Sequence, residues 1–559
     1  MIQAHQLKGI PASPGFAVGP AVVLVIRERR PVKRMIGENE IPYEWNKFQA
    51  ALDQARLELS ELVRRLEEGG NAEQASIMEG QLYLIDDPEI VQGVSDRIQN
   101  ERVSADFAVY ETFGEVVKTL ALIEDEYIRE RIADLQDVKN RLLEQITGET
   151  DKAAALLTRP SILLAHDITP SMTAQLNKEL VMGFVTEVGS RTSHTSIMAR
   201  TFGIPAVVGC GEFLAGWSDG ETVIVDGETG EVFQNPSEQQ LAEYAKKQEA
   251  YARSKEELQA FKDIPAETID GKRFGMYGNI GTPAEAAAVL ESGGEGIGLF
   301  RSEFLFMDRA AMPSEEEQYA AYRAVLETMS GKPVIVRTLD VGGDKEIPYL
   351  PIGSEFNPFL GWRAIRYCLS DTALFKVQLR ALLRASAHGD LRIMFPMISG
   401  EQEILDAKRL LDEARSELEA EGIAAAAGMP IGIMIEVPSA ALVSDRLARH
   451  VDFFSIGTND LIQYTLAADR MNEKVSYLYD SQHLAVLRLI RMVCENARKF
   501  NVHVGMCGEM AGDPQLVEIL IGLGVEEFSM SAEQIPLVKK SVRSLSEEAA
   551  RIRMTQTLE

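Results

Sequence analysis

The spacing of apolar residues differs from one part of this chain to the next. Between residues 43 and 147, apolar side chains recur at i, i+3, i+4 and i+7 and glycines are few, which predicts amphipathic helices. Helix-breaking pairs at Gly69-Gly70, Asp87-Pro88 and Val103-Ser104 divide this region into about four helices. We therefore expect a bundle built from helical hairpins.

Short apolar runs replace the helical period in the next region. They alternate with turns and short helical patterns, which is typical of an α/β domain. The runs lie at 161–165, 181–185 and 222–225. The first twenty residues also look like strand and turn, so we expect residues 1–20 and 148–235 to form one α/β domain, with the bundle of residues 21–147 inserted into it.

A third pattern follows a charged stretch at residues 236–262, whose helix formers and weak apolar stripe predict a semi-rigid helical linker. From residue 263 to residue 559, strand-like runs alternate with helical patterns, and eight β-then-α units fit a (β/α)8 TIM barrel with insertions. The eight runs are 274–280, 296–300, 333–336, 391–395, 431–435, 451–456, 502–506 and 527–530. The predicted fold is thus multidomain, α and α/β, with a C-terminal barrel.

Composition and charge limit the class of protein. A chain of 559 residues exceeds the ~250–300 residues of a single core, and 45% apolar with 25% charged residues is ordinary for a globular protein. A net charge of −28, spread along the chain, argues against nucleic acid and anionic membranes as partners. Neither a leader-like segment nor an apolar run of ~18 residues is present, so we expect a cytoplasmic protein without membrane insertion.

One histidine has a distinctive setting. His194 follows a Gly-rich turn that begins at Gly189, between the apolar run 181–185 and a helix-like stretch. Unpaired N–H groups and the dipole at a helix start disfavour an imidazolium and favour an anion, the two properties that a phosphoryl-carrying histidine needs. A lone histidine in a polar turn is more often only a hydrogen-bonded turn residue, so its function depends on the rest of the chain.

Polar residues follow several of the predicted barrel strands, where such barrels keep their active sites. Structural ion pairs on a barrel rim explain one or two of them but not the convergence of so many strand ends. The residues at these ends are Arg301, Arg337, Asp340, Glu436, Asn459, Asp460, Cys507 and Glu509.

The residue types at these strand ends indicate the chemical class of the ligand. Guanidinium and ammonium groups match phosphate and carboxylate oxygens, and the candidates are Arg301, Arg337, Arg470 and Lys345. Glu436 and Asp460 offer two hard oxygen ligands, enough for Mg²⁺ when substrate and water complete the octahedron, and Asn459 can donate to a phosphate oxygen. This set indicates phosphoryl transfer on a small substrate that carries phosphate and carboxylate groups.

The cysteines indicate neither zinc nor disulfides, because Cys210, Cys368, Cys494 and Cys507 are far apart and lack CxxC spacing. Cys507 follows a strand among cations, and two interpretations stay open: a buried sulfur, or a proton donor to a carbanion-like carbon. In that setting we expect its thiol to have both protonation states accessible near neutral pH.

Seven segments resemble the phosphoenolpyruvate-utilising enzymes, and among them the enzyme I family of the bacterial sugar phosphotransferase system. The resemblance runs from about residue 9 to about residue 536. The segments are Gly-Ser-Arg-Thr-Ser-His-Thr-Ser-Ile-Met-Ala-Arg (189–200), Gly-Leu-Phe-Arg-Ser-Glu-Phe-Leu-Phe-Met (298–307), Val-Arg-Thr-Leu-Asp-Val-Gly-Gly-Asp-Lys (336–345), Asn-Pro-Phe-Leu-Gly-Trp-Arg-Ala-Ile-Arg (357–366), Gly-Ile-Met-Ile-Glu-Val-Pro-Ser (432–439), Ser-Ile-Gly-Thr-Asn-Asp-Leu (455–461) and Met-Cys-Gly-Glu-Met-Ala (506–511). Ser190 stands where the family usually has a second glycine.

The resemblance implies a role for each candidate. Mg²⁺ is held by Glu436 and Asp460, and His194 takes the phosphoryl group of phosphoenolpyruvate, steadied by Arg200. Cys507 protonates enolpyruvate to pyruvate. The substrate oxygens are bound by Arg301, Arg337, Lys345, Arg363, Asn459 and Arg470.

The resemblance also implies partners. Phosphohistidine 194 passes its phosphoryl group to a histidine of the phosphocarrier protein HPr, which docks on the helical bundle, and the protein dimerises through its barrel. No sensory domain precedes the first strands, which favours the sugar branch over the nitrogen-related branch. A dikinase or phosphoenolpyruvate synthase needs an ATP-binding domain that residues 1–150 are too short and too helical to supply. A non-catalytic binding module is the alternative of another class, and the intact set of candidate residues disfavours it.

Overall fold

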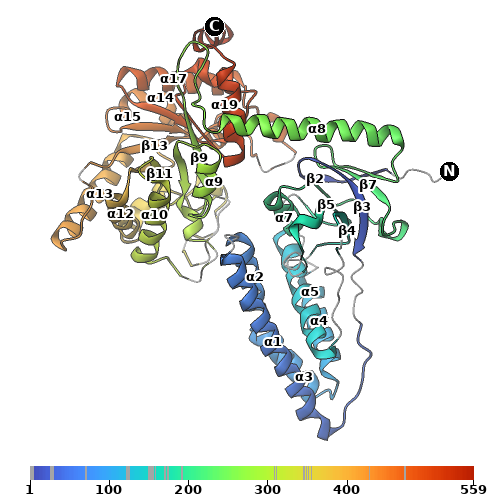
Figure 1. Ribbon diagram of the computed structural model, residues 1–559. Helices are drawn as coiled ribbons and strands as arrows, with labels where there is room; N and C mark the ends of the chain where they lie inside the picture. The colour runs from blue at the N-terminus through green and yellow to red at the C-terminus, as the bar shows by residue number, and fades with distance from the viewer. Residues whose placement is uncertain are drawn as a thin grey trace. The chain divides into compact units, whose positions relative to one another are not determined.

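The computed structural model forms two compact units, residues 1–254 and 255–559 (Figure 1). It describes residues 6–24, 30–68, 72–120, 126–148, 157, 159–168, 172, 176–190, 193–307, 309, 311–343, 347, 349–350, 352–353, 355–426, 428–470, 472 and 474–558. Within these ranges the side chains of residues 66–68, 72–77, 126–131, 133, 194, 197, 201 and 255 are outside the description.

The first unit contains an eight-stranded sheet of order β1-β8-β7-β3-β4-β5-β6-β2. Its central strands β3 to β6 are parallel, and the outer pairs are antiparallel. The first three strands come from the start of the chain and pair with strands that lie beyond the helical region. The bounds are β1 Gln6–Lys8, β2 Ile10–Ser13, β3 Phe16–Leu24, β4 Ser161–Ala165, β5 Val181–Thr186, β6 Ala206–Val208, β7 Thr222–Asp226 and β8 Glu231–Gln234.

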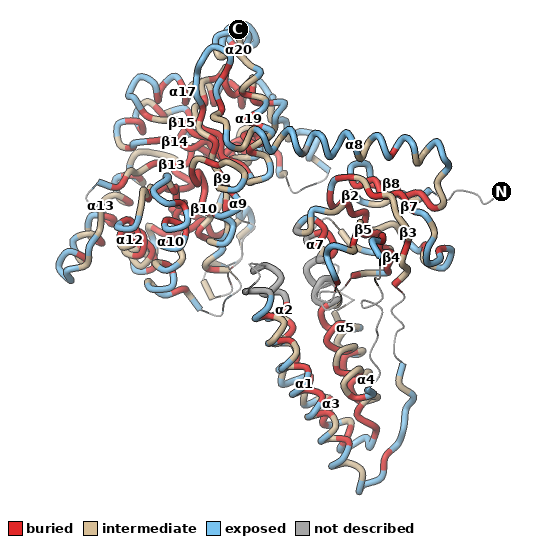
Figure 2. The backbone as a smooth tube through the Cα atoms, in the orientation of Figure 1, coloured by how far each residue is buried: buried red, intermediate tan, exposed pale blue. Residues whose placement is uncertain are grey.

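Among the described residues of this unit, five helices form the bundle, where about four were predicted. They are α1 Ile41–Glu68, α2 Ala72–Ile85, α3 Pro88–Gln99, α4 Ala105–Leu120 and α5 Glu126–Thr147. The helix not predicted comes from α4 and α5, which pack against each other and are separate elements. Residues 121–125 between them contain no glycine or proline and are outside the described residues. Apolar residues at helical spacing, such as Phe48, Val94, Phe113 and Leu142, meet in one core (Figure 2).

The second unit is built on a closed barrel of eight parallel strands, β9 to β16, which confirms the predicted fold. Each predicted run overlaps an observed strand. The strands are β9 Gly275–Ile280, β10 Gly296–Arg301, β11 Val334–Arg337, β12 Leu391–Phe395, β13 Ile431–Ile435, β14 Phe453–Ile456, β15 His503–Met506 and β16 Glu527–Met530.

Helices connect these strands and surround the barrel. They are α9 Glu285–Glu291, α10 Glu315–Met329, α11 Ile365–Ser370, α12 Thr372–Ala385, α13 Glu401–Ala420, α14 Pro438–Leu442, α15 Ser444–Leu447, α16 Thr458–Leu466, α17 Leu484–Lys499, α18 Val517–Leu523, α19 Ile535–Arg543 and α20 Glu547–Leu558. One continuous apolar core joins the outer faces of the strands to these helices. The carboxyl ends of all eight strands therefore open on one face of the barrel, as parallel strands require.

The predicted linker is a helix, α8 Glu238–Phe261, and both of its ends are anchored. Near its start the Tyr244 hydroxyl donates to Asp226 Oδ2 at 2.9 Å, and Gln248 donates to the Phe16 carbonyl at 3.0 Å. Just beyond its end, Lys539 of α19 donates to the carbonyl of Lys262 at 2.6 Å. The helix is thus held by a different unit at each end.

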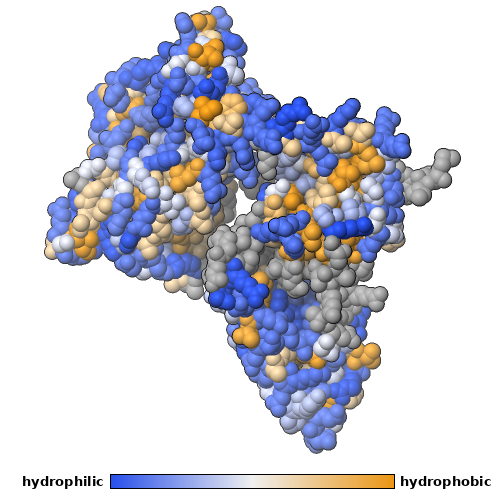
Figure 3. Space-filling view, in the orientation of Figure 1, coloured by the Kyte–Doolittle hydropathy of each residue, from blue (hydrophilic) through white to orange (hydrophobic). Residues whose placement is uncertain are grey.

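Hydrophilic residues cover most of the visible face of the barrel unit (Figure 3). Exposed apolar side chains are scattered among them, as is normal for a folded surface. Among the residues that the structure describes, no helix combines the length and apolar character needed to cross a membrane.

Candidate active site

A cavity of about 610 Å³ opens at the carboxyl ends of the barrel strands. The charged side chains at its wall come from different strands and the turns that follow them. The predicted residues on this wall are Arg301, Arg337, Asp340, Arg363, Glu436, Asn459, Asp460, Arg470, Cys507 and Glu509. Lys345 lies outside the described residues. The barrel thus brings together residues up to about two hundred positions apart in the sequence.

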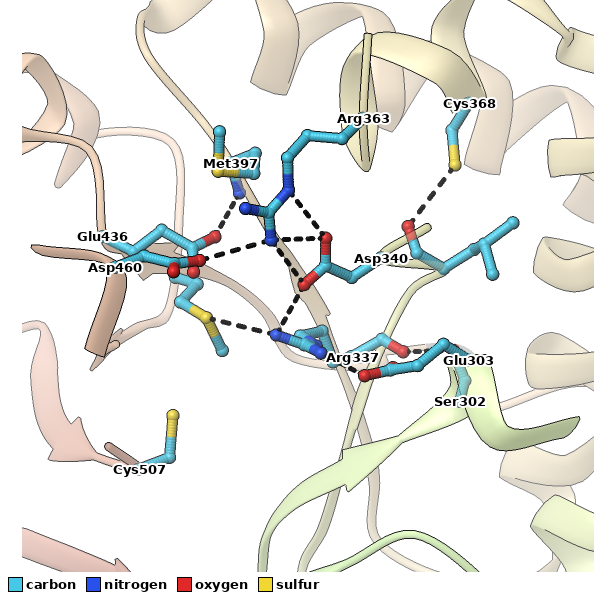
Figure 4. A network of polar contacts seen from close by, with 12 residues as sticks. Ser302, Glu303, Arg337, Asp340, Arg363, Cys368, Met397, Glu436, Asp460 and Cys507 are labelled. Carbon is cyan, nitrogen blue, oxygen red and sulfur yellow. Dashed lines mark hydrogen bonds and ion pairs between the residues drawn. The ribbon is translucent and has the colours of Figure 1, made fainter. Parts of the chain in front are cut away.

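A chain of alternating charges crosses the floor of this cavity (Figure 4). Arg337 pairs with Glu303 on one side and, at 2.9 Å, with Asp340 on the other. Arg363 contacts both oxygens of Asp340, at 3.0 and 3.1 Å, and reaches Asp460 Oδ2 at 3.2 Å. All five side chains are buried.

The two arginines of this chain are held as cations. Burial alone lowers the pKa of Arg337, but the charges of Glu303 and Asp340 outweigh it and raise the pKa above its usual value. For Arg363 the burial effect is again outweighed, by Asp340 and Asp460. Removing one partner of such a buried pair leaves an uncompensated charge and costs about 3–5 kcal/mol.

Glu436 lies beside this chain and accepts a hydrogen bond from the Met397 N–H at 2.5 Å. Burial, then the negative charges of Asp460 and Asp340, raise the pKa of Glu436 to about 8. Met397 has a φ of 56°, in the left-handed region that a non-glycine residue rarely adopts, and this conformation accompanies the Met397–Glu436 hydrogen bond. Arg337 and Arg363 only partly offset this rise, so a further cation beside the Glu436 carboxyl would favour its ionised form.

The donor set fits a hard divalent cation. Glu436 and Asp460 are two neighbouring carboxylates in a buried site, and a cation between them relieves the repulsion that raises the pKa of Glu436. Among the described residues, no group of three or more His, Cys, Asp and Glu side chains is arranged to enclose a metal. Among the described residues, Glu436 and Asp460 are therefore the candidates to hold such a cation, which would need further oxygen ligands to complete its coordination.

Two other arginines are available for an anion. In the described part of the chain, neither the Arg301 nor the Arg470 guanidinium makes a hydrogen bond or ion pair, although both line the cavity. The Nε of Arg470 is buried without a partner. A buried donor without a partner is costly, and a phosphate or carboxylate oxygen would satisfy it. As far as the described residues go, the cavity thus contains two arginines that are paired with carboxylates and two that are left to bind a ligand.

Asn459 is held at the rim by Glu509, which the sequence placed at a strand end without a role, and by Tyr479, which sequence reasoning did not assign to the site. Its amide exchanges two hydrogen bonds with Glu509, and the Tyr479 hydroxyl donates to its backbone carbonyl at 3.1 Å. Sequence reasoning also left Glu303 and Tyr464 out of the site. Glu303 could have been found, because a charged residue within the apolar run 298–307 is a signal of a buried ion pair.

Cys507 is 4% exposed and lies apart from the chain of ion pairs in Figure 4. Burial raises the pKa of its thiol to about 11, and the hydrogen bond from Ser455 and the charge of Arg337 only partly offset this effect. The expectation of two accessible protonation states near neutral pH was therefore wrong, because burial outweighs the nearby cations. The thiol keeps its proton at neutral pH, as a proton donor requires.

His194 is the first residue of α7 His194–Phe202, so the predicted helix start is confirmed. The side chain of His194 is outside the described residues, and its chemistry stays a prediction. The preceding Ser193 makes no side-chain cap, because its hydroxyl donates to the Ser190 carbonyl at 2.9 Å. Ser190 has no positive φ, so a glycine is not required there. Arg200 donates to the Ala12 carbonyl at 2.9 Å, and its support of a phosphohistidine stays a prediction.

The loop that approaches the cavity from β11 contains Gly342 and Gly343, with φ of 98° and 72°. A Cβ on Gly342 would lie 2.7 Å from the Cβ of Arg363, so glycine lets the chain pass this arginine closely. Lys345, three residues on, is outside the described residues, and its role stays a prediction.

Comparisons with known proteins agree with this geometry. Three family models match the chain: PEP-utilising enzyme, N-terminal, at residues 8–131; mobile domain, at residues 157–230; and PEP-binding domain, at residues 255–547. The phosphoenolpyruvate-protein phosphotransferase of Staphylococcus carnosus (strain TM300) is 47% identical over 97% of this chain and 95% of its own. The protein of the same name from Bacillus sp. (strain S) is 46% identical over 99% and 96%. An NMR solution structure of an enzyme I protein is 39% identical over 44% of this chain and 99% of its own, with a TM-score of 0.38. The chain therefore belongs to the family of phosphoenolpyruvate-utilising enzymes.

Proposed function

We propose that this protein transfers the phosphoryl group of phosphoenolpyruvate to its own His194 and then to a histidine of the phosphocarrier HPr, releasing pyruvate, as the first step of the sugar phosphotransferase system. The relatives named phosphoenolpyruvate-protein phosphotransferase support the substrate. The observation that carries the proposal is the cavity itself, where two arginines without a partner among the described residues and two neighbouring carboxylates meet at the barrel mouth. This set binds an anion and a divalent cation side by side.

Each residue of the cavity has a part in holding the substrate. Glu436 and Asp460 would hold Mg²⁺, which neutralises charge on the carboxylate and phosphate when bound. Arg301 and Arg470 bind substrate oxygens directly, since neither guanidinium makes a hydrogen bond or ion pair with the part of the chain that the structure describes. Arg337, Arg363, Asn459 and Lys345 complete the binding set as the resemblance implies.

In the first transfer, a ring nitrogen of His194 attacks phosphorus in line, a nitrogen–phosphorus bond forms, and the bond to the enol oxygen breaks. The arginines stabilise the charge that spreads over the equatorial oxygens. The enolate then takes the thiol proton of Cys507 at carbon, giving pyruvate. The protonated state of this thiol supports the assignment, and solvent must restore the proton afterwards.

The second transfer requires the residues 1–20 and 148–235 to move between the barrel and HPr. Because α8 is anchored at Tyr244 and Gln248 on one side and beyond Phe261 on the other, we place the hinge within its residues 252–256. HPr would dock on the bundle of residues 21–147, and Arg200 would steady the phosphohistidine.

A homodimer through residues 263–559 completes the proposal. Apolar side chains on loops beyond the carboxyl ends of the barrel strands support it, because they are largely exposed in a single chain. They include Phe356, Leu360 and Tyr477, which are 105%, 65% and 78% exposed.

The test is incubation with phosphoenolpyruvate labelled in its phosphoryl group, with Mg²⁺, followed by identification of the labelled residue. We expect an acid-labile, base-stable bond at His194 and transfer of the label to added HPr. His194→Ala should accept no label. Undiminished labelling of this variant, or labelled protein that never passes its label to HPr, would contradict the proposal.

A further inference from the structure

The turns that follow β14 and β15 are packed against each other at the cavity rim. The Cys507 N–H donates to the Ile456 carbonyl at 3.1 Å and extends the ladder between the two strands. Gly508 lies so close to Thr458 that a Cβ at this position would overlap the threonine hydroxyl. These contacts place the turn that carries the proposed proton donor directly beside the first turn of α16, which carries Asn459.

A pair of hydrogen bonds fixes the Asn459 amide between these turns. Asn459 Nδ2 donates to Glu509 Oε1 at 2.9 Å, and the Glu509 backbone N–H donates to Asn459 Oδ1 at 2.9 Å. This pairing assigns the two ends of the amide, since a turned-over amide would place two donors and two acceptors against each other. One hydrogen on Nδ2 is left for another acceptor.

We propose that Glu509 is a positioning residue, which fixes the Asn459 amide so that its remaining N–H can donate to a phosphate oxygen in the cavity. This inference rests on the proposed function, in which Asn459 binds the substrate. A turned-over amide would present its carbonyl oxygen to the anion, and two acceptors repel each other.

Glu509 acts through Asn459 rather than on the substrate. Its carboxylate has the same charge sign as a phosphate and cannot attract one. Glu509 lines the cavity but is exposed at the rim, so its contribution is to orientation rather than to the apolar core. The Tyr479 hydroxyl, which donates to the Asn459 carbonyl, holds the main chain while Glu509 holds the side chain.

Two variants of the full-length protein separate this role from an effect of charge. Glu509→Gln and Glu509→Ala have the same net charge, but only glutamine keeps a side-chain oxygen that can accept from Asn459 Nδ2. Using 2-phosphoglycolate with Mg²⁺ as the probe in calorimetry, we expect Glu509→Ala to bind about tenfold more weakly than Glu509→Gln. Glu533→Gln, at an exposed carboxylate away from the cavity, should match the wild type.

A double-mutant cycle identifies the residue through which Glu509 acts. In the background of Asn459→Ala, the difference between the two Glu509 variants should disappear, because the group that they position is gone. Equal affinities of the two variants in the wild-type background would overturn the inference, even if their melting temperatures differed. A tenfold difference that persists without the Asn459 amide would overturn it as well. Failure of the wild type itself to bind the probe would instead refute the proposed function.

Discussion

Asp340 offers the sharpest test of the buried chain of charges. It is 1% exposed and contacts two guanidinium groups, Arg337 at 2.9 Å and Arg363 at 3.0 Å. Asp340→Asn keeps the size of the side chain but removes the charge between two buried cations. Breaking one buried pair costs about 3–5 kcal/mol, because the remaining charge is left uncompensated. For a unit of roughly 300 residues, this loss lowers the melting temperature by about 5–8 °C.

A matched control lies in the same unit. Asp390 pairs with Arg392 at 2.8 Å, but the two side chains are 35% and 26% exposed. Solvent screens such a pair, so Asp390→Asn should cost no more than about 1 kcal/mol. Calorimetry of the full-length protein would compare the unfolding transition of the barrel unit in both variants. Equal shifts of the melting temperature in the two variants would refute the reasoning. Burial would then not determine how much an Asp–Arg pair contributes to the free energy of unfolding.

Three further predictions follow from the site and the barrel. Glu436→Gln or Asp460→Asn should keep the fold but slow phosphorylation from phosphoenolpyruvate by several orders of magnitude, and near-normal labelling rates in both would place the metal elsewhere. Cys507→Ala should still accept the label slowly but lose stereospecific deuterium delivery when pyruvate forms in heavy water, and retained stereospecificity would remove the thiol from the mechanism. Burial lowers the pKa of His503, but its hydrogen bonds to Glu526 and Glu527 outweigh burial and raise it to about 9. Protonated His503 therefore stabilises the folded protein fully at pH values below its pKa in the unfolded state, about 6.5, and this stabilisation is lost as the pH rises through about 9. The His503 side chain is 43% exposed, so solvent screens part of the effect. Urea unfolding should therefore show a loss of roughly 1–2 kcal/mol in the free energy of unfolding over this pH range, and His503→Gln should abolish that loss. An unchanged pH dependence in the variant would contradict the pairing.

The barrel could be predicted from the sequence because each of its units is a local pattern. A strand such as β12 is a mainly apolar run, interrupted only by Arg392, and the predicted range 391–395 coincides with the observed one. The fifth helix of the bundle was missed because no local pattern marks the place where it begins. No glycine or proline separates α4 from α5, so nothing local indicated the boundary.

The candidate residues of the cavity could be predicted because they follow strands, but their partners could not. Arg337 meets Glu303 from a neighbouring strand end, and Arg363 bridges Asp340 and Asp460 across the cavity floor. Such pairs depend on side-chain directions in the closed barrel, which residue spacing does not specify. The pKa of the Cys507 thiol could not be predicted either, because it depends on burial that the sequence does not reveal.

The balance of charge in the cavity links binding of the anion to binding of the cation. The described wall has five carboxyl groups, Glu303, Asp340, Glu436, Asp460 and Glu509, facing four guanidinium groups, Arg301, Arg337, Arg363 and Arg470, so its charges nearly balance. An anion with phosphate and carboxylate groups would make this site strongly negative, and a divalent cation alone would make it positive. Each charge therefore stabilises the other, and by linkage each ligand raises the affinity for its partner by the same factor. We expect phosphoenolpyruvate and Mg²⁺ to bind together far more tightly than either binds alone.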